Sequence, residues 1–192
     1  MLKKILLSIG TAAFLLDLSG CMAMAASGAV ATTASVAHDR RSAGTIVDDK
    51  GLEFRAFQAI HNVPNSLKSH VSAVSYNNNI LLVGQVTSDE QRAEIENSIR
   101  NLEKVRRIYN EIAVSTPTQL PIRSKDAWIS TKIKSNLLFN DLVDGSRIKV
   151  CTEDGVVYLM GIVNTAEEEH AVEVARHVDG VKKVVKLFEY TS

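Results

Sequence analysis

The sequence has few cysteines, prolines and glycines, and it has no surplus of charge of either sign. Its 192 residues include 2 cysteines, which are too few for a disulfide framework. With 10 glycines and 3 prolines, the chain is neither collagen-like nor of low complexity. Because 22 acidic residues balance 22 basic ones, the charge gives no reason to expect a nucleic-acid partner, which usually meets a basic stripe.

The motifs of catalytic and metal sites are missing as well. No serine lies in a Gly-x-Ser-x-Gly elbow, no glycine-rich phosphate loop is present, and no two histidines have the spacing of a helical zinc site. His170 and His177 are seven residues apart and could share one helix face, which is more simply explained as a solvated face than as a metal site. We therefore expect a protein without enzymatic activity, cofactor or metal.

The first 20 residues have the pattern of a secretory signal. Two lysines precede an apolar stretch at residues 5–16, which is too short to span a bilayer that requires about 20 residues. The following Leu18-Ser19-Gly20-Cys21 resembles the lipobox of bacterial lipoproteins. The resemblance implies acylation of Cys21 by chains such as palmitate and, because Met22 rather than Asp comes next, an anchor at the outer membrane that faces the periplasm. The alternative is an ordinary signal peptide with a chance cysteine.

Residues 21–45 are expected to comprise the acylated cysteine and a flexible tether, since residues 22–45 are rich in alanine, serine, threonine and glycine. If Cys21 carries lipid, Cys151 cannot form an intramolecular disulfide. Its place in a predicted strand favours the role of a small apolar residue over that of a reactive thiol.

The rest of the chain contains an internal repeat. With an offset of 77 residues, the helical pattern i, i+4, i+8 occurs twice, at Leu52, Ala56 and Ile60 and at Ile129, Ile133 and Leu137. The same offset relates two strand patterns, Ile80-x-Leu82-x-Gly84-x-Val86 and Val157-x-Leu159-x-Gly161-x-Val163. In each copy a further helix and a closing strand follow, with an offset of 76.

Each copy therefore predicts the order helix, strand, strand, helix, strand. The expected fold class is α+β, with two helices on one face of a small three-stranded mixed sheet in each of two tandem domains. We expect domain 1 at residues 46–115 and domain 2 at residues 124–192. Residues 116–123 would form a linker, in which Pro117 and Pro121 favour an extended chain.

The predicted strands are apolar on both faces. The residues that would face the helices alternate with a second apolar set, which comprises Tyr158, Met160 and Ile162 and, in the first copy, Leu81 and Val83. Left uncovered, this set would form a contiguous exposed patch. We therefore expect the sheets of the two domains to pack against each other.

The repeat resembles the BON domain, a small αββαβ module of bacterial envelope proteins. Its marks are a glycine in the second strand and a Gly-Val pair before the last one: Gly84, Gly161 and Gly180-Val181, with Lys104-Val105 in the first copy. Similarity to outer-membrane lipoproteins with two BON domains extends to Arg41-Ser42-x-Gly44-Thr45-x-Val47-Asp48-Asp49 and Trp128-Ile129-x-Thr131-Lys132. The resemblance implies binding of anionic phospholipid, a role in outer-membrane integrity and no catalysis.

The helix expected from Asp126 onward carries the candidate phospholipid site. At about 100° per residue, its outer side or edge holds Trp128, Thr131, Ser135, Leu138 and Phe139, flanked by Lys132 and Lys134. An indole with apolar neighbours suits the depth of lipid headgroups, and ammonium groups suit their phosphates. The alternative is that Trp128 packs on the other domain or on the linker.

The equivalent side of the first copy has Glu53 and Arg55 and no tryptophan, so lipid binding is assigned to domain 2. The expected function is that of a lipid-anchored periplasmic protein that binds anionic phospholipid membranes. The alternative is a scaffold for outer-membrane assembly proteins, in which Trp128 and the apolar sheet faces bind protein.

Overall fold

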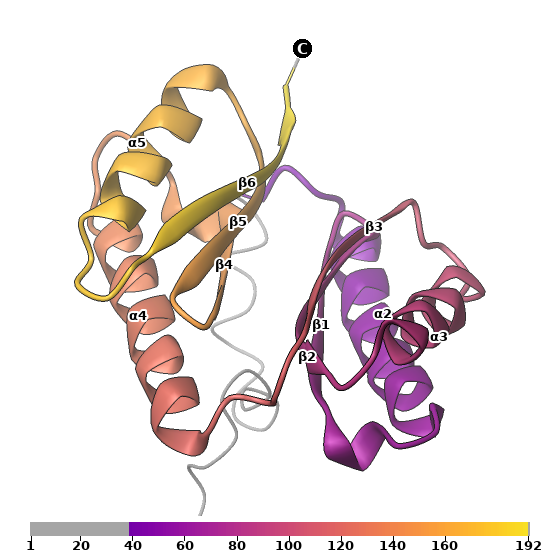
Figure 1. Cartoon of the computed structure of the whole chain (residues 1–192). Helices are drawn as coiled ribbons and strands as arrows, with labels where there is room; N and C mark the ends of the chain where they lie inside the picture. The colour runs from indigo at the N-terminus through magenta and orange to yellow at the C-terminus, as the bar shows by residue number, and fades with distance from the viewer. Residues whose placement is uncertain (1–38, 192) are drawn as a thin grey trace, which may run out of the picture.

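The computed structural model describes residues 39–191, which form two domains of the same architecture (Figure 1). Domain 1 consists of α2 (Ala43–Asn62), the 3-10 helix η2 (Ser66–Lys68), β1 (His70–Tyr76), β2 (Asn79–Val86), α3 (Asp89–Arg100) and β3 (Arg107–Val114). Domain 2 consists of α4 (Leu120–Leu138), the 3-10 helix η3 (Gly145–Arg147), β4 (Ile148–Glu153), β5 (Val156–Val163), α5 (Thr165–Arg176) and β6 (Lys183–Tyr190). The predicted signal peptide, Cys21 and most of the predicted tether lie outside the described residues.

Each domain has one mixed sheet with its helices on one face. β1 pairs antiparallel with β2, and β2 pairs parallel with β3; β4, β5 and β6 repeat this arrangement. The helices enclose a core that contains the predicted helix positions, each at most 3% exposed: Leu52, Ala56, Ile60, Ile129, Ile133 and Leu137. The predicted α+β fold class is therefore confirmed.

A buried aspartate on the first helix of each domain holds the turn between the first two strands. In domain 1, the Asp49 carboxylate accepts hydrogen bonds from the backbone N–H groups of Asn77 and Asn78, both at 2.8 Å. In domain 2, Asp126 accepts from the N–H groups of residues 154 and 155, again at 2.8 Å. All four turn residues have positive φ, as tight hairpin turns require. The two aspartates that mark the repeat thus have the same structural role.

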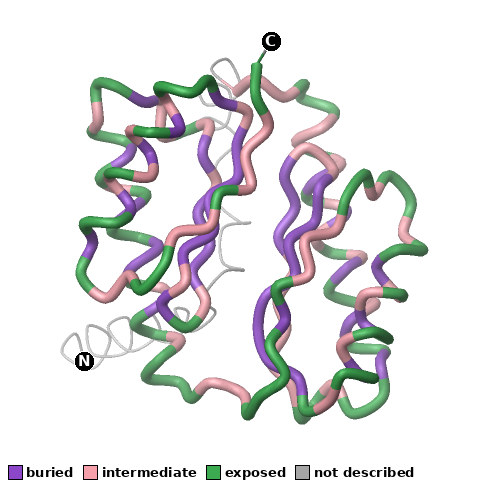
Figure 2. The backbone as a smooth tube through the Cα atoms, turned by 45° about the horizontal axis from the view of Figure 1, so that its top comes forward, coloured by how far each residue is buried: buried purple, intermediate pink, exposed green. Residues whose placement is uncertain are grey.

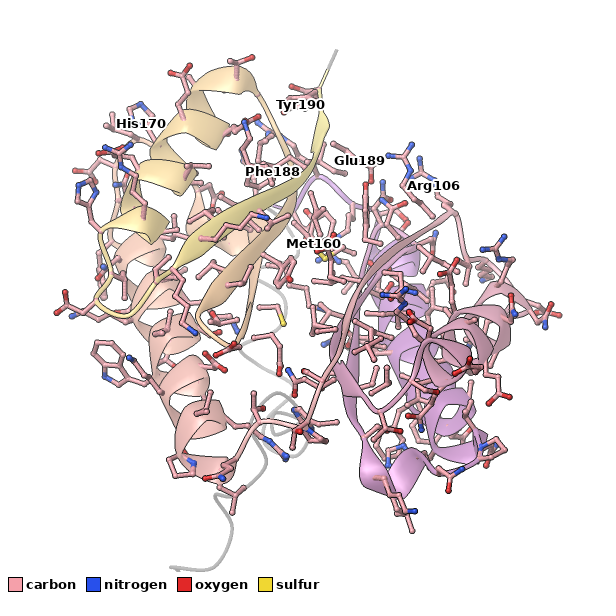
Figure 3. All side chains as sticks on the ribbon, viewed as in Figure 1. Arg106, Met160, His170, Phe188, Glu189 and Tyr190 are labelled. Carbon is pink, nitrogen blue, oxygen red and sulfur yellow. The ribbon has the colours of Figure 1, made fainter. Side chains whose placement is uncertain are left out.

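The two sheets pack face to face, so that the molecule has four layers in the order helices, sheet, sheet, helices (Figure 1). Figure 2 shows that the strands are largely buried where the domains meet. An apolar cluster fills this domain interface and consists of Val74, Tyr76, Leu81, Val83, Cys151, Tyr158 and Met160. The expected packing of the apolar sheet faces is confirmed, and Met160 points from domain 2 into the interface (Figure 3).

Polar contacts surround the apolar part of the interface. The Tyr76 hydroxyl donates to the backbone oxygen of Arg147 at 3.0 Å. Near the start of β3, Arg106 donates to the Glu189 carboxylate of β6 at 3.2 Å, and these side chains face each other in Figure 3. The domains are therefore joined by side chains from both sheets as well as by the linker.

Two consecutive arginines before α2 bind different domains. Arg40 donates to the backbone oxygen of Ile162 at 2.7 Å and to the Glu167 carboxylate at 2.6 Å, both in domain 2. Arg41 donates to the Asp49 carboxylate of domain 1 at 2.8 Å. The residues just before α2 therefore bridge the two domains.

An ion pair between Lys149 of β4 and Glu53 of α2 lies within the interface. Lys149 also donates to the backbone oxygen of Ser75 on β1 at 2.9 Å. Burial lowers the pKa of Lys149, although the charge of Glu53 opposes this effect. Burial alone would raise the pKa of Glu53, but the charge of Lys149 and its hydrogen bond hold it below the ordinary value of 4.5. Each group therefore depends on the other for charge compensation across the interface.

Two helices begin earlier than predicted. α2 begins at Ala43, within the predicted tether, because Ser42 caps it by accepting a hydrogen bond from the Thr45 N–H group. α4 begins at Leu120 with Pro121 in its first turn, so the prediction that Pro121 keeps the whole linker extended is wrong. Proline is favoured in the first turn of a helix, where its missing N–H group is not needed.

Replacement of Gly84 by alanine is expected to destabilise domain 1 by at least about 3 kcal/mol. Gly84 has a φ of 124°, and an added Cβ would lie 1.9 Å from the backbone oxygen of His70 on the neighbouring strand. Gly44→Ala is the control, because its nearest neighbour would be the Ser42 side chain at 3.7 Å and alanine favours a helix. Urea unfolding measures both variants, and equal stabilities would contradict the proposed constraint at Gly84.

Glu53→Gln is expected to lower the free energy of unfolding by about 2 kcal/mol at neutral pH, because it leaves Lys149 without its counter-charge. This loss of stability is smaller than for a fully buried ion pair, because the Lys149 side chain is still 25% exposed. The lowered pKa of Glu53 adds stability above pH 4.5 that is lost as the pH falls through the folded-state pKa. The deficit of Glu53→Gln should therefore shrink in acid.

The control for this ion pair is Glu173→Gln, whose partner Arg176 lies on the same exposed stretch of α5. We expect this change to alter stability by less than about 0.5 kcal/mol, as is usual for surface pairs. Chemical unfolding across a pH series measures both variants. An equally small effect of Glu53→Gln at neutral pH would refute the importance of the interfacial pair.

Candidate functional site

The outer side of α4 is an exposed apolar surface. Trp128 is 51% exposed, Leu138 is 62% exposed and Phe139 is 87% exposed, whereas the apolar residues on the inner side of the helix are fully buried. Leu142, which the sequence analysis did not single out, follows the helix and is 63% exposed. Trp128 thus lies on the outer side of its helix, about 15 Å along the helix axis from the exposed apolar residues at its C-terminal end.

The two lysines of the candidate site lie on opposite sides of Trp128. At about 100° per residue, Lys132 is about 40° from Trp128 around the helix axis, while Lys134 is about 120° away in the other direction. Lys134 lines a cavity that domain 1 shares through Arg41 and Lys50. The helix therefore groups Lys132 with Trp128, and it places Lys134 toward the other domain.

The equivalent helix of domain 1 differs from the sequence-based expectation. Glu53, expected on its outer side, points into the domain interface and binds Lys149. Apolar residues occupy the outer side instead, where Val47 is 70% exposed, Phe54 is 56% exposed and Phe57 is 43% exposed. Domain 1 therefore also presents an apolar helix surface, although it has no tryptophan.

The sequence contains a signal for this second surface. Val47, Phe54 and Phe57 are separated by seven and three residues, which places them on one side of a helix. That side lies away from Leu52 and Ala56, which are fully buried. The spacing could have identified the surface, whereas the shared cavity depends on how the two domains pack.

The candidate metal ligands His170 and His177 and the candidate thiol Cys151 lie in ordinary structural environments. Among residues 39–191, no group of three His, Cys, Asp or Glu residues is placed to hold a metal ion. His170 lies on the outer side of α5 (Figure 3), and the His177 ring nitrogen lies 2.8 Å from the backbone oxygen of Glu173. Cys151 is buried in the apolar cluster between the sheets. Within the same residues, no helix is both long enough and apolar enough to cross a membrane.

Comparison with known proteins identifies the fold and its relatives. The BON domain family matches residues 48–116 and 125–192. The chain is 36% identical over 190 residues to the outer membrane lipoprotein DolP of Haemophilus influenzae, which covers 98% of this chain and 96% of that protein. It is 40% identical over 153 residues to a 21 kDa hemolysin of Actinobacillus pleuropneumoniae, with 79% of each chain covered. It is 28% identical over 144 residues to the osmotically-inducible protein Y of Escherichia coli, covering 73% of this chain and 72% of that protein.

These relatives do not belong to enzyme families. The similarity to DolP extends over nearly the whole chain, including the N-terminal residues that precede the two BON domains. Both the predicted outer-membrane location and the predicted pair of BON domains agree with this relationship. From its repeat, its two mixed sheets and these matches, the chain belongs to the outer-membrane lipoproteins with two BON domains.

Proposed function

We propose that this outer-membrane lipoprotein binds anionic phospholipid through the outer side of α4 and thereby supports the integrity of the outer membrane, without catalysis. The observation that carries the proposal is the exposure of Trp128 together with Leu138 and Phe139 on one side of the helix. Exposed apolar residues that gather in this way often mark an interaction surface, while single ones are common on any protein.

The chemistry of this surface suits the interfacial layer of a membrane. The Trp128 indole is apolar with one N–H group, and such rings favour the depth of the headgroups. Lys132 is exposed beside Trp128, where its ammonium group can reach a lipid phosphate. An amphipathic helix with these features lies in the membrane surface and does not cross it.

The predicted anchor brings this surface close to lipid. Asp39, the first described residue, follows Cys21 by 18 positions, a span of at most about 65 Å when fully extended. A tethered domain meets the membrane at a high effective concentration, so that a weak affinity of α4 for headgroups is sufficient.

The alternative function, a scaffold for outer-membrane assembly proteins, relied on Trp128 and on the apolar sheet faces. The sheet faces are buried against each other in the domain interface, where Leu81 is fully buried and Met160 is 2% exposed. For a protein partner, the alternative therefore leaves only the outer side of α4. That surface has the composition expected of a membrane contact.

Trp128→Ala is expected to weaken binding to phosphatidylglycerol vesicles at least tenfold (roughly, from the loss of one interfacial indole). The melting temperature should change little, because an exposed side chain contributes much less to stability than the about 3–5 kcal/mol of a buried tryptophan. Vesicle co-sedimentation uses the chain without residues 1–20 and with Cys21→Ser. A large loss of stability with binding retained would mean that Trp128 belongs to the core and that α4 is not the lipid surface.

The charge of the site is tested by Lys132→Glu combined with Lys134→Glu. We expect this double change to weaken binding to anionic vesicles more than to neutral phosphatidylcholine vesicles, because the lysines act on headgroup charge. Equal weakening on both kinds of vesicle would contradict a preference for anionic lipid.

Cys21→Ser in the full chain is expected to release the protein into the periplasm or to leave it poorly processed, since the acylated thiol is the predicted anchor. Fractionation of cells into periplasm and outer membrane measures this change. If the variant still fractionates entirely with the outer membrane, Cys21 is not the anchor.

A further inference from the structure

A cavity of about 190 Å³ lies between α2 of domain 1 and α4 of domain 2. Its position follows from the packing of the sheets, because α2 covers β1, α4 covers β4, and these two strands meet at one edge of the molecule. The polar side chains that line it are mainly basic: Arg41, Lys50, Lys134 and Lys149, with Asp49 as the acidic member.

The charges around this cavity are mostly but not completely compensated. Arg41 binds Asp39 and Asp49, and Lys149 binds Glu53. Lys50 shares Glu53 at 3.2 Å, and its side chain is 72% exposed.

Lys134 has no ion-pair partner among residues 39–191. When the ion-pair partners Asp39 and Glu53 are counted with Asp49, three acidic groups compensate four basic ones. One positive charge remains at the cavity, carried by Lys50 and Lys134. This surplus matches the single negative charge of a phosphodiester.

On both helices an exposed apolar side chain follows a lining lysine by one turn. One turn after Lys50, Phe54 is 56% exposed, and one turn after Lys134, Leu138 is 62% exposed. On α2 the exposed apolar surface continues through Val47 and Phe57. Each helix therefore places a lysine at the cavity and an exposed apolar residue beside it.

We propose that this cavity binds the phosphate of an anionic phospholipid headgroup, so that domain 1 takes part in lipid binding through Lys50 and Phe54. The proposal rests on the proposed function and extends it from one helix to two. The volume is below the roughly 300–1,000 Å³ of pockets that enclose a whole small molecule. A headgroup phosphate fits, and its acyl chains stay outside the cavity, beside Phe54 and Leu138.

The apolar flanks favour a lipid over a soluble phosphate compound as the ligand. A soluble anion would use the lysines and leave Phe54, Leu138 and Val47 exposed to water. A lipid headgroup within a bilayer accounts for both the lysines and the apolar residues. Its phosphate meets the ammonium groups, while the apolar residues enter the acyl boundary.

The test compares Lys50→Glu with Lys183→Glu in the chain without residues 1–20 and with Cys21→Ser. Both changes alter the net charge equally, but Lys183 lies on β6, the strand farthest from β4 in its sheet. Each basic group near an anionic membrane contributes about a fivefold gain in binding, so Lys50→Glu should weaken co-sedimentation with phosphatidylglycerol vesicles about 25-fold. Lys183→Glu should weaken it less than about twofold, because salt screens distant charges. Phe54→Ala should weaken binding to anionic and neutral vesicles alike.

Three outcomes would overturn the proposal and can be told apart. If Trp128→Ala abolishes vesicle binding while Lys50→Glu behaves like Lys183→Glu, the function of α4 stands and the cavity has no part in it. If the parent chain does not bind phosphatidylglycerol vesicles at all, the proposed function fails as well. If inorganic phosphate alone shifts the NMR signals of Lys50 and Lys134 as strongly as phosphatidylglycerol does, the cavity is a site for soluble anions. Melting temperatures and the milder Lys50→Gln variant, with an expected fivefold loss, separate these results from misfolding.

Discussion

A sheet with helices on only one face has to bury its other face, and the rest of this structure depends on how that requirement is met. Both faces of β2 and β5 are apolar, so either domain alone would expose a large patch. The two domains cover each other, which produces the four layers. Since β1 and β4 meet at one edge of this stack, the helices that cover them, α2 and α4, flank the same edge. The surface that we propose for membrane contact is thus determined by packing inside the protein.

The interface also explains where the two copies of the repeat diverged. In domain 2, Ser130 of α4 donates to the Thr152 hydroxyl at 2.8 Å, and this contact stays within the domain. The equivalent residue of α2, 77 positions earlier, is Glu53, which accepts from the Ser75 N–H group at 3.0 Å and also binds Lys149 of the other domain. A longer, charged side chain at this position converts a contact within one domain into a link between two. Because this position faces inward in both copies, the outer side of α2 is formed by Val47, Phe54 and Phe57.

The sequence was sufficient to predict how each copy folds by itself, because periodicity indicates the buried face of each helix and strand. It identified Leu52 and Ile129 as core positions and Trp128 as an outer residue, all in agreement with the structure. It could not determine the direction of Glu53, whose partner lies 96 residues away. Nor could it identify the shared cavity, because Lys50 and Lys134 come together only after the sheets have packed. The sequence does not distinguish the two roles of Pro121, because proline suits both an extended linker and a first helical turn.

The two helices at this edge are related by the repeat but differ in the residues that they would present to lipid under the proposed function. Trp128 of α4 corresponds to Gly51 of α2, so only domain 2 can insert an indole at this position. Lys134 of α4 corresponds to Phe57 of α2, so α4 has a charged residue where α2 has an exposed apolar one. Contact through a single helix would leave the protein free to turn about that helix axis. Contact through two unlike helices, with headgroups bound between them, would fix one orientation on the membrane, and each additional contact would strengthen the others because it acts within an already bound molecule.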